Sequence, residues 1–362
     1  MMVMMMMVKR VFFLMLCLVQ MQGVMTAEVH WCYTNSSCAP ATWSINFPTL
    51  CNSTSRQSPV NINSSAAVPM SPVDPLSLYG WNATAGQNWT VTNNGHSVSV
   101  SLPGNLSVSG GALNGTYLTD SFHFHWGAPG NQSTGSEHAI DGVWYPLEMH
   151  IINYKQSYGN VSAAKNYPDG LAVFGVFFQV GGNFSSLDSI LAALSNISRP
   201  GMNSSVMAPS LQSFVPGALE SSIAGPFYRY SGSLTTPTCD ESVIWSVFQA
   251  PLFLGQAQLD LFRTLLYYDA EGKEPLVNNF RPIQNLGSRA VYYTGTANAT
   301  TTASTNATTT ASTNATTNAT TLSPATASPT AAAPGQHPPL PGLTTSLLIL
   351  ASLLTWAAGA HL

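Results

Sequence analysis

The stretch Phe122-His123-Phe124-His125-Trp126-Gly127 places two histidines one residue apart among aromatic side chains. Positions i and i+2 point the same way on a β-strand, whereas they do not share a face of a helix. His123 and His125 are therefore predicted to project from one face of a strand. The aromatic residues between and beside them favour strands and would pack on the opposite, buried face.

A third imidazole for the same point in space is offered by Glu148-Met149-His150, which begins another β-like run. Glu148 and His150 would share one face of that strand. Three neutral histidines with an open fourth position are typical of catalytic zinc, because structural zinc closes its tetrahedron with protein ligands. The sequence thus predicts a Zn²⁺ site built from His123, His125 and His150.

The N-terminus predicts secretion. Lys9 and Arg10 precede an apolar run over residues 11–19, and the small residues Thr26 and Ala27 follow. This order is typical of a secretory signal peptide, and the run is too short to span a membrane. Residues 1–27 are therefore expected to be removed and the remainder to be extracellular.

Cysteines and glycosylation motifs agree with that compartment. Of the five cysteines, Cys17 lies in the signal peptide, which leaves Cys32, Cys38, Cys51 and Cys239. Their even number predicts two disulfides with three possible connectivities, and their spacing is not that of a zinc knuckle. Motifs for N-glycosylation are dense and predict a glycoprotein; they occur at Asn35, Asn52, Asn63, Asn82, Asn88, Asn105, Asn114, Asn131, Asn160, Asn183, Asn196 and Asn203.

Residues 28–295 are predicted to form one domain that is mainly β. Short alternating runs such as 98–102 and 171–177 are separated by Gly, Pro and Asn-Gly turns. Helical periodicity is sparse and is best at 186–195 and 255–267. The expected fold is α+β, with a large, mostly antiparallel central sheet and a few short helices. Charged residues make up only 7% of the chain and the net charge is −4, which gives no sign of a nucleic-acid partner.

The C-terminal part predicts a stalk and an anchor. Residues 296–342 consist largely of Thr, Ser, Ala, Asn and Pro, lack the apolar surface needed to fold, and are typical of a glycosylated stalk. Residues 343–362 end in an apolar run with no basic residue after it, which favours a glycosylphosphatidylinositol (GPI) anchor signal. A single C-terminal transmembrane helix or a secreted form is the alternative.

The chain resembles the α-class carbonic anhydrases, especially their extracellular, membrane-linked branch, over approximately residues 31–289. Seven separated motifs carry this resemblance in order: Arg56-Gln57-Ser58-Pro59-Val60-Asn61-Ile62, Asn93-Asn94-Gly95-His96, the stretch at 122–127, Gly135-Ser136-Glu137-His138, Glu148-Met149-His150, Ser233-Leu234-Thr235-Thr236-Pro237 and Asn279-Phe280-Arg281-Pro282. The resemblance implies the α-carbonic anhydrase fold. It also implies reversible hydration of CO₂ to bicarbonate and a proton at the outer cell surface.

The same resemblance implies the roles of the residues around the metal. Zinc on the three histidines lowers the pKa of a bound water to about 7, a value that comes from carbonic anhydrases themselves, and the resulting hydroxide attacks CO₂. Thr235 would orient that hydroxide while donating a hydrogen bond to Glu137. Thr236 would contact bicarbonate.

An apolar pocket for CO₂ is implied as well. Its lining would be Leu234, Ile152, Val173, Val243 and Trp245. Ile152 stands where a smaller Val is common in the family, so the pocket is expected to be narrower and turnover modestly slower. Asn153 and Ser99 also differ from common family choices on the expected cavity wall, where they would change inhibitor preference more than catalysis.

The resemblance assigns proton export to His96, because a histidine with a pKa near 6.5 can shuttle protons at neutral pH. Tyr33 and Asn94 would order the water chain that leads to it. The zinc ligands would in turn be held by hydrogen bonds from their distal ring nitrogens. Glu148 would hold His150 and the backbone carbonyl of Asn279 would hold His125. Ser121 stands where a Gln usually supports the first ligand, and it is expected to be too short for that contact.

Disulfides Cys32–Cys38 and Cys51–Cys239 are implied by the membrane-linked branch. The implied partners are CO₂ and bicarbonate, a membrane reached through the lipid anchor, and bicarbonate transporters as candidates. The alternative function is a non-catalytic, carbonic-anhydrase-like binding or matrix module on a glycosylated stalk. Such relatives typically lose zinc histidines, whereas all three are present here.

Overall fold

The computed structural model describes residues 29–70, 74–130, 133–218 and 224–295. The predicted signal peptide, stalk and anchor signal fall on residues 1–27, 296–342 and 343–362, which lie outside the described residues. None of the helices in the described part of the chain has the length and apolar character needed to span a bilayer.

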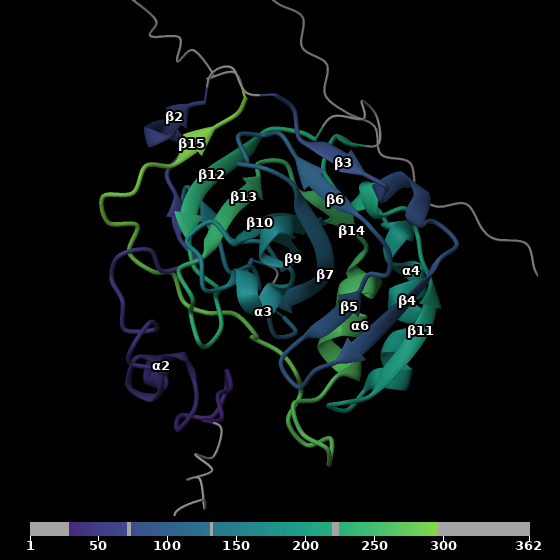
Figure 1. The fold of residues 1–362 in the computed structure, drawn as a ribbon. Coiled ribbons are helices and arrows are strands. Elements are labelled where there is room, and N and C mark those ends of the chain that lie inside the picture. The colour runs from purple at the N-terminus through teal and green to yellow at the C-terminus, as the bar shows by residue number, and fades with distance from the viewer. Residues whose placement is uncertain (1–28, 71–73, 131–132, 219–223, 296–362) are drawn as a thin grey trace, which may run out of the picture. The chain divides into compact units, whose positions relative to one another are not determined.

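A sheet of thirteen strands forms the centre of the domain (Figure 1). Its main path runs β11-β4-β5-β7-β9-β10-β13-β12-β15-β2, with β3, β6 and β14 attached beside it. The strand bounds are β2 Val68–Pro69, β3 Ser77–Tyr79, β4 Asn88–Asn93, β5 Val98–Ser101, β6 Ser107–Ser109, β7 Tyr117–Trp126, β9 Leu147–Lys155, β10 Leu171–Val180, β11 Asn203–Met207, β12 Phe227–Gly232, β13 Val243–Phe248, β14 Leu252–Leu254 and β15 Tyr292–Tyr293. A separate two-stranded sheet pairs β1 Asn61–Ile62 with β8 Ala139–Ile140.

The strand pairings are mostly antiparallel, as predicted. The parallel exceptions are β10 with β13, β10 with β14, β15 with β2, and the separate pair of β1 with β8. The predicted dominance of β-structure in a mixed α+β domain is therefore confirmed.

Helices are short and lie around the sheet. The two predicted helical segments are confirmed as α4 (Asp188–Ala193) and α6 (Gln256–Leu265). Two others, α2 (Pro40–Asn46) and α3 (Val161–Ala164), are too short for a periodic pattern to stand out. The described residues also contain short 3₁₀-helices: η1 Ser64–Ala66, η2 Trp81–Thr84, η3 Gln156–Tyr158, η4 Ser185–Leu187, η5 Leu194–Ile197 and η6 Leu211–Phe214.

The two faces of the central sheet bury different cores. Phe122, Phe124 and Trp126 of β7 pack into the larger core, together with apolar residues of α4 and α6. Val173 of β10 and Trp245 of β13 belong to the smaller core on the opposite face. The strand alternation predicted from the aromatic residues around the histidines is therefore confirmed.

A β-bulge interrupts β7 at Asp120. The register of β7 against β9 shifts between Thr119 and Ser121, so Asp120 is the extra residue. Before the bulge, Tyr117 faces the larger core, and after it Phe122 does so. These positions are five residues apart, and an unbroken strand would point them to opposite faces. The bulge thus keeps both halves of β7 facing the same core and leaves the histidines on the other face.

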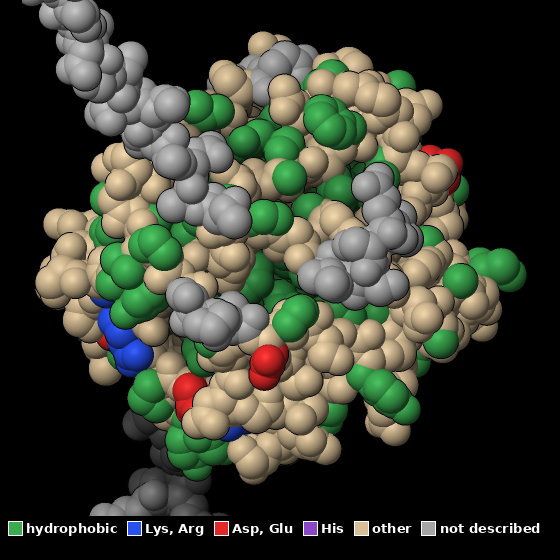
Figure 2. Space-filling model, turned by 90° about the horizontal axis from the view of Figure 1, so that it is seen from above, with side chains coloured by type: hydrophobic (Ala, Val, Ile, Leu, Met, Phe, Trp, Pro, Cys, Tyr) green, Lys and Arg blue, Asp and Glu red, His purple; other side chains and the backbone are tan. Residues whose placement is uncertain are grey.

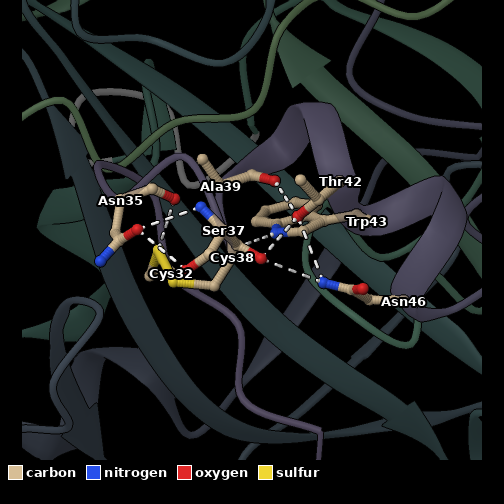
Figure 3. The surroundings of a disulfide bond; sticks show 8 residues. All are labelled: Cys32, Asn35, Ser37, Cys38, Ala39, Thr42, Trp43 and Asn46. Atoms are coloured by element: carbon tan, nitrogen blue, oxygen red, sulfur yellow. Dashed lines mark hydrogen bonds between the residues drawn. A yellow bond between two sulfur atoms is a disulfide. The ribbon is translucent and has the colours of Figure 1, made fainter.

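The N-terminal segment forms a small third core with the loop after β12. Tyr33, Trp43, Cys51 and Cys239 pack together there. Figure 3 shows the Cys32–Cys38 disulfide, next to which Nε1 of Trp43 donates a hydrogen bond of 2.9 Å to the carbonyl of Cys38. A second disulfide joins Cys51 to Cys239, so both implied pairings are confirmed.

Charged side chains are sparse on the face seen in Figure 2, where uncharged polar and apolar groups cover most of the surface. No histidine of the described residues is visible on that face, and the histidine group described below comes from β7 and β9.

Candidate metal and catalytic site

The three predicted ligands meet on adjacent strands. His123 and His125 of β7 and His150 of β9 each offer a ring nitrogen, and these atoms all lie within 4.8 Å of one another. His123 and His150 are directly opposed in the antiparallel register. Nε2 of His125 is 3.1 Å from Nδ1 of His150. The strand pairing alone therefore gathers three imidazoles that could hold one metal ion.

Glu148 fixes the orientation of His150. Nε2–H of His150 donates to Oε1 of Glu148 at 2.8 Å, which leaves Nδ1 free to face the other histidines. The same carboxylate accepts hydrogen bonds from the backbone N–H of Glu137 and from the backbone and Nδ1 of His138. Gly175 lies opposite His150 on β10, where an added Cβ would approach Oε1 of Glu148 to 3.1 Å. A side chain there would crowd the carboxylate that carries these four bonds.

Asn279 fixes the orientation of His125. Nδ1–H of His125 donates to the backbone carbonyl of Asn279 at 2.6 Å, as the resemblance implied. The side chain of Asn279 also donates to the backbone carbonyls of Phe124 and His96 and accepts from the backbone N–H of Trp126. One asparagine therefore ties the ligand strand to the turn that carries His96.

His123 has no such support. Oγ of Ser121 donates to Oδ2 of Asp120 at 2.8 Å instead of reaching the ligand. Within the described ranges, no hydrogen bond to the His123 ring is present. The expected consequence of the short serine is therefore observed, and His123 is held by packing and strand position alone.

Burial keeps the three imidazoles neutral. Desolvation lowers the pKa of His123 well below its ordinary value and that of His125 to about 4, and it also lowers the pKa of His150. A neutral imidazole has a free lone pair, which is the form that binds a metal. Borderline-soft nitrogen donors in a group of three suit zinc, so the residues present fit that ion.

Glu137 lies beside this group in the interior. Its Oε1 accepts the backbone N–H of Arg281 at 2.7 Å, and its Oε2 is 3.6 Å from Nε2 of His125 and 3.9 Å from Nδ1 of His150. Burial raises the pKa of Glu137 to about 7, against the opposing effects of His150, Thr235 and Arg281. Oε2 has no partner with full hydrogen-bond geometry among the described residues, although Thr235 lies close enough to lower the pKa of the carboxyl.

A model of the eukaryotic-type carbonic anhydrase family matches residues 38–295. The chain belongs to this family. It is 35% identical to carbonic anhydrase 4 of Oryctolagus cuniculus over 291 residues, which cover 79% of this chain and 91% of that protein. The prediction of a carbonic anhydrase is therefore confirmed.

Two other relatives are similar to the chain to about the same degree. Carbonic anhydrase 15 of Mus musculus is 33% identical over 291 residues, covering 77% of this chain and 88% of the relative. Carbonic anhydrase 12 of Homo sapiens is 35% identical over 240 residues, covering 65% and 66%.

In this carbonic anhydrase, the predicted pocket residues gather beside His150. They belong to, or pack against, the smaller core: Val173, Val243 and Trp245 are buried, and Ile152 and Leu234 are half-buried. The ring of Trp245 lies 4.8 Å from that of His150, and Ile152 is opposed to Val173. The structure thus brings together an apolar wall next to the histidines. Thr235 is buried and Thr236 is half-buried in the loop that follows β12.

Ser99 and Asn153, both expected on the cavity wall, lie on opposite faces of the sheet in the structure. Ser99 of β5 is opposed to His123 and lies on the same face of the sheet. Asn153 is fully buried on the other face, where it accepts a hydrogen bond from Thr119 and donates to the carbonyl of Ala172. The placement of Asn153 on the cavity wall is wrong, because its position in β9 is one residue out of phase with His150 and Ile152.

His96 is stacked on Trp31 near the N-terminal segment. The two ring centroids are 3.7 Å apart and the planes differ by 11°. Burial, followed by the charge of His30, lowers the pKa of His96 to about 4. Asn94 shapes the turn by accepting the backbone N–H groups of His96 and Ser97. Tyr33 is buried in the third core, in edge-to-face contact with Trp31.

A buried chain of hydrogen bonds extends from the ligand region to β12. His138 bonds Glu148 through Nδ1 and the hydroxyl of Tyr230 through Nε2, and that hydroxyl lies 2.9 Å from Oγ of Ser58. His138 and Ser58 stand in two of the motifs that carry the resemblance, but nothing in their spacing joins them. Only the fold shows that they support Glu148.

Proposed function

We propose that the chain hydrates CO₂ reversibly to bicarbonate and a proton, with Zn²⁺ held by His123, His125 and His150. The observation that carries this proposal is the group of three neutral imidazoles, with His125 and His150 buried and His123 half-buried, in a chain of the carbonic anhydrase family. Zinc in such a site supplies Lewis acidity and lowers the pKa of a water to about 7, a value taken from carbonic anhydrases themselves.

Thr235 and Glu137 are proposed to orient the attacking oxygen. The hydroxyl of Thr235 accepts a hydrogen bond from that oxygen and donates its own proton toward Oε2 of Glu137, whose other oxygen is occupied by the N–H of Arg281. Because the only proton of the threonine hydroxyl is then donated to Glu137, the threonine can only accept a hydrogen bond from the attacking oxygen. This favours one orientation of that oxygen toward CO₂. Thr236 is proposed to hold bicarbonate before it leaves.

The apolar wall next to His150 is proposed to receive CO₂. This substrate carries no net charge and gains little from hydrogen bonds, so an apolar surface can hold it without desolvating a polar group. Val173, Val243, Trp245, Leu234 and Ile152 supply that surface.

His96 is proposed to carry the released proton to solvent, with Tyr33 and Asn94 placing it at the end of a water chain. In the stacked position its pKa is about 4, so the ring is neutral at pH 7 and binds a proton weakly. Greater exposure raises that pKa toward the value of a free histidine, which is suited to proton transfer at neutral pH. The stack on Trp31 is therefore the resting position, and movement of the ring off the indole favours proton uptake.

The enzyme is proposed to act outside the cell as a glycoprotein, attached by a GPI anchor after removal of residues 1–27. The two disulfides support an oxidising compartment. The composition of residues 296–342 and the apolar end of the chain support the stalk and the anchor. Bicarbonate transporters are the proposed neighbours in the membrane.

The test is CO₂ hydration and zinc content of the purified full chain, compared with His123→Ala and with Tyr79→Ala, at an exposed position, as the control. Zinc near one equivalent and rapid hydration are expected for the wild type and the control. Loss of both is expected in His123→Ala. Bound zinc without hydration in the wild type would contradict the enzyme and favour the binding or matrix module.

His96 is tested separately by its dependence on buffer. His96→Ala should slow hydration at least several-fold in dilute buffer and recover when a concentrated imidazole buffer accepts the proton instead. An equal loss in both buffers would contradict the proton-transfer role.

A further inference from the structure

A cavity with a volume of about 480 Å³ lies beside His96. Three segments line it: residues 30–38 at the N-terminal end of the domain, the turn that carries His96, and residues 268–274. His96 is half-buried and belongs to the lining, so the cavity is a route by which a proton acceptor can reach the ring. Asn35 and Ser37 belong to the same lining.

Asn35 begins a motif for N-glycosylation, Asn35-Ser36-Ser37, in the short loop closed by the Cys32–Cys38 disulfide. Its side chain is exposed, and its Oδ1 accepts hydrogen bonds from the backbone N–H and the hydroxyl of Ser37, at 3.0 and 2.9 Å. Its Nδ2 makes no hydrogen bond to any of the described residues, and none is drawn to it in Figure 3. A sugar can therefore be attached to Nδ2 without breaking a contact of the folded chain.

The position of Asn35 determines where an attached glycan would begin. The two bonds from Ser37 fix the side-chain amide, and the disulfide fixes the loop that carries it. The first sugar would therefore start at the wall of the cavity and not on a free tail. Glycans are bulky and strongly hydrated, so a glycan at this place would occupy space in front of His96.

The chain contains a matched position elsewhere. Asn63-Ser64-Ser65 is also a glycosylation motif, and Oδ1 of the exposed Asn63 accepts the backbone N–H and the hydroxyl of Ser65, at 3.1 and 2.8 Å. Asn63 follows β1 and does not line the cavity beside His96. The two motifs share their local geometry and differ in where they place a glycan.

We propose that Asn35 carries an N-glycan that covers the cavity beside His96 and limits by size the molecules that reach the ring. The inference rests on the proposed role of His96 in proton transfer. A small base accepts the proton from the ring nitrogen of His96 on its own lone pair and leaves protonated. A large base cannot approach closely enough to form the hydrogen bond along which the proton moves. The glycan would thus select small proton acceptors without contacting the metal ligands.

Occupancy of Asn35 is tested by mass spectrometry of the purified full chain, secreted by a glycosylating cell and treated with peptide N-glycosidase F in heavy-oxygen water. The enzyme releases the glycan and converts the asparagine that carried it into an aspartate with one heavy oxygen. Most copies of the peptide that contains residue 35 are expected to show this mass. A peptide without the change would overturn the proposal.

Access to His96 is tested by CO₂ hydration with two proton acceptors, imidazole and imidazole linked to polyethylene glycol. Both carry the same base, so the acidic Asp269 and Glu274 of the lining act on it alike. The wild type should be accelerated several-fold less by the large acceptor than by the small one. Asn35→Gln and Ser37→Ala, which both remove the motif, should respond equally to the two acceptors.

Asn63→Gln is the matched control and should behave like the wild type. Equal responses of the wild type to the two acceptors would overturn the proposal, and so would an Asn35→Gln variant that still discriminates. An equal response in Asn63→Gln would assign the effect to glycans in general and would also overturn it. Because Asn35, Ser37 and Asn63 are exposed, an unchanged unfolding transition verifies that the variants are folded.

A readout without activity separates this inference from the proposed function. The ring-proton signals of His96 in nuclear magnetic resonance spectra should be broadened by a bulky, soluble gadolinium complex more strongly in Asn35→Gln than in the wild type. This difference is expected even if the wild type does not hydrate CO₂. Equal broadening in the two proteins would show that no glycan covers His96.

Discussion

Two parts of the histidine site are held in different ways: the floor, formed by His125 and His150, and the rim, formed by His96 and Trp31. On the floor, directional hydrogen bonds from Glu148 and Asn279 orient His150 and His125 in a buried environment. On the rim, His96 rests on Trp31 through ring stacking, and its Nδ1 has no hydrogen-bond partner among the described residues. Bonded geometry resists displacement, whereas a stacked ring can move without breaking a hydrogen bond. The floor therefore suits ligand positioning and the rim suits a group that must move.

The largest effect on stability and zinc affinity is expected from Glu148→Gln, which replaces the carboxylate that orients His150. Burial acts to raise the pKa of Glu148, but His138 and His150 outweigh it and hold the pKa well below its usual range, so the carboxylate is ionised. An amide has one acceptor oxygen for the four donors that surround it. We expect a loss of about 3–5 kcal/mol in the free energy of unfolding and zinc binding about 10–100-fold weaker. Urea unfolding and zinc titration measure both, with the exposed Glu274→Gln as the control; a loss below about 1 kcal/mol would contradict a structural role of the floor.

A smaller effect is expected from removing the disulfide that joins the N-terminal segment to the loop that carries Thr235. Cys51 and Cys239 are 188 residues apart in the sequence, whereas Cys32 and Cys38 are 6 apart. In the chain-entropy model the stabilisation grows with the length of the closed loop, so Cys51→Ala/Cys239→Ala should cost about 2–5 kcal/mol and more than Cys32→Ala/Cys38→Ala. Urea unfolding of the two double variants ranks them. The reverse order would contradict loop closure as the cause.

Glu241→Gln tests the loop that carries Thr235. The effect of this substitution on stability is expected to depend on pH. Burial acts to raise the pKa of Glu241, but hydrogen bonds from Ser53, Ser55, Gln57 and Arg56 outweigh it and bring the pKa to about 2. A lowered carboxyl pKa stabilises the fold above the ordinary value of 4.5, and this stabilisation is lost as the pH falls toward 2.

The variant should therefore be less stable by about 1–2 kcal/mol at pH 7. The difference from wild type should shrink as the pH is lowered from about 4.5 toward 2. Urea midpoints measured between pH 7 and pH 3 provide the test. A difference that stays constant across this range would show that the charge of Glu241 is not responsible.

At the rim, Trp31→Ala is expected to change the titration of His96. Removing the indole exposes His96, so its pKa should rise from about 4 toward 6.5. Nuclear magnetic resonance titration of the ring protons measures it. His30→Gln removes only the secondary, electrostatic cause and should raise the pKa less. A larger rise in His30→Gln would mean that charge, not burial, controls the ring.

The ligand group was predictable because it depends on local rules. The alternation of β7 and the i, i+2 spacing of Glu148 and His150 determine which side chains share a face. For each strand this can be predicted from the sequence of that strand alone. Asn153 is misplaced when a family position is transferred without regard to that alternation. The chain from His138 through Tyr230 to Ser58 could not be found this way. Its members come from strands and loops distant in sequence, and only tertiary packing brings them together.

The extra residue at Asp120 makes one point of β7 tolerant of a change in chain length. Tyr117 and Phe122 reach the same core across five positions because Asp120 is left out of the pairing with β9. Deleting Asp120 would bring them to four positions apart, which an unbroken strand also directs to one face, so the histidines would keep their side. A deletion between Phe122 and Trp126 would instead turn part of the strand over. Insertions and deletions among relatives are therefore expected to collect at the bulge and to avoid the segment that carries the ligands.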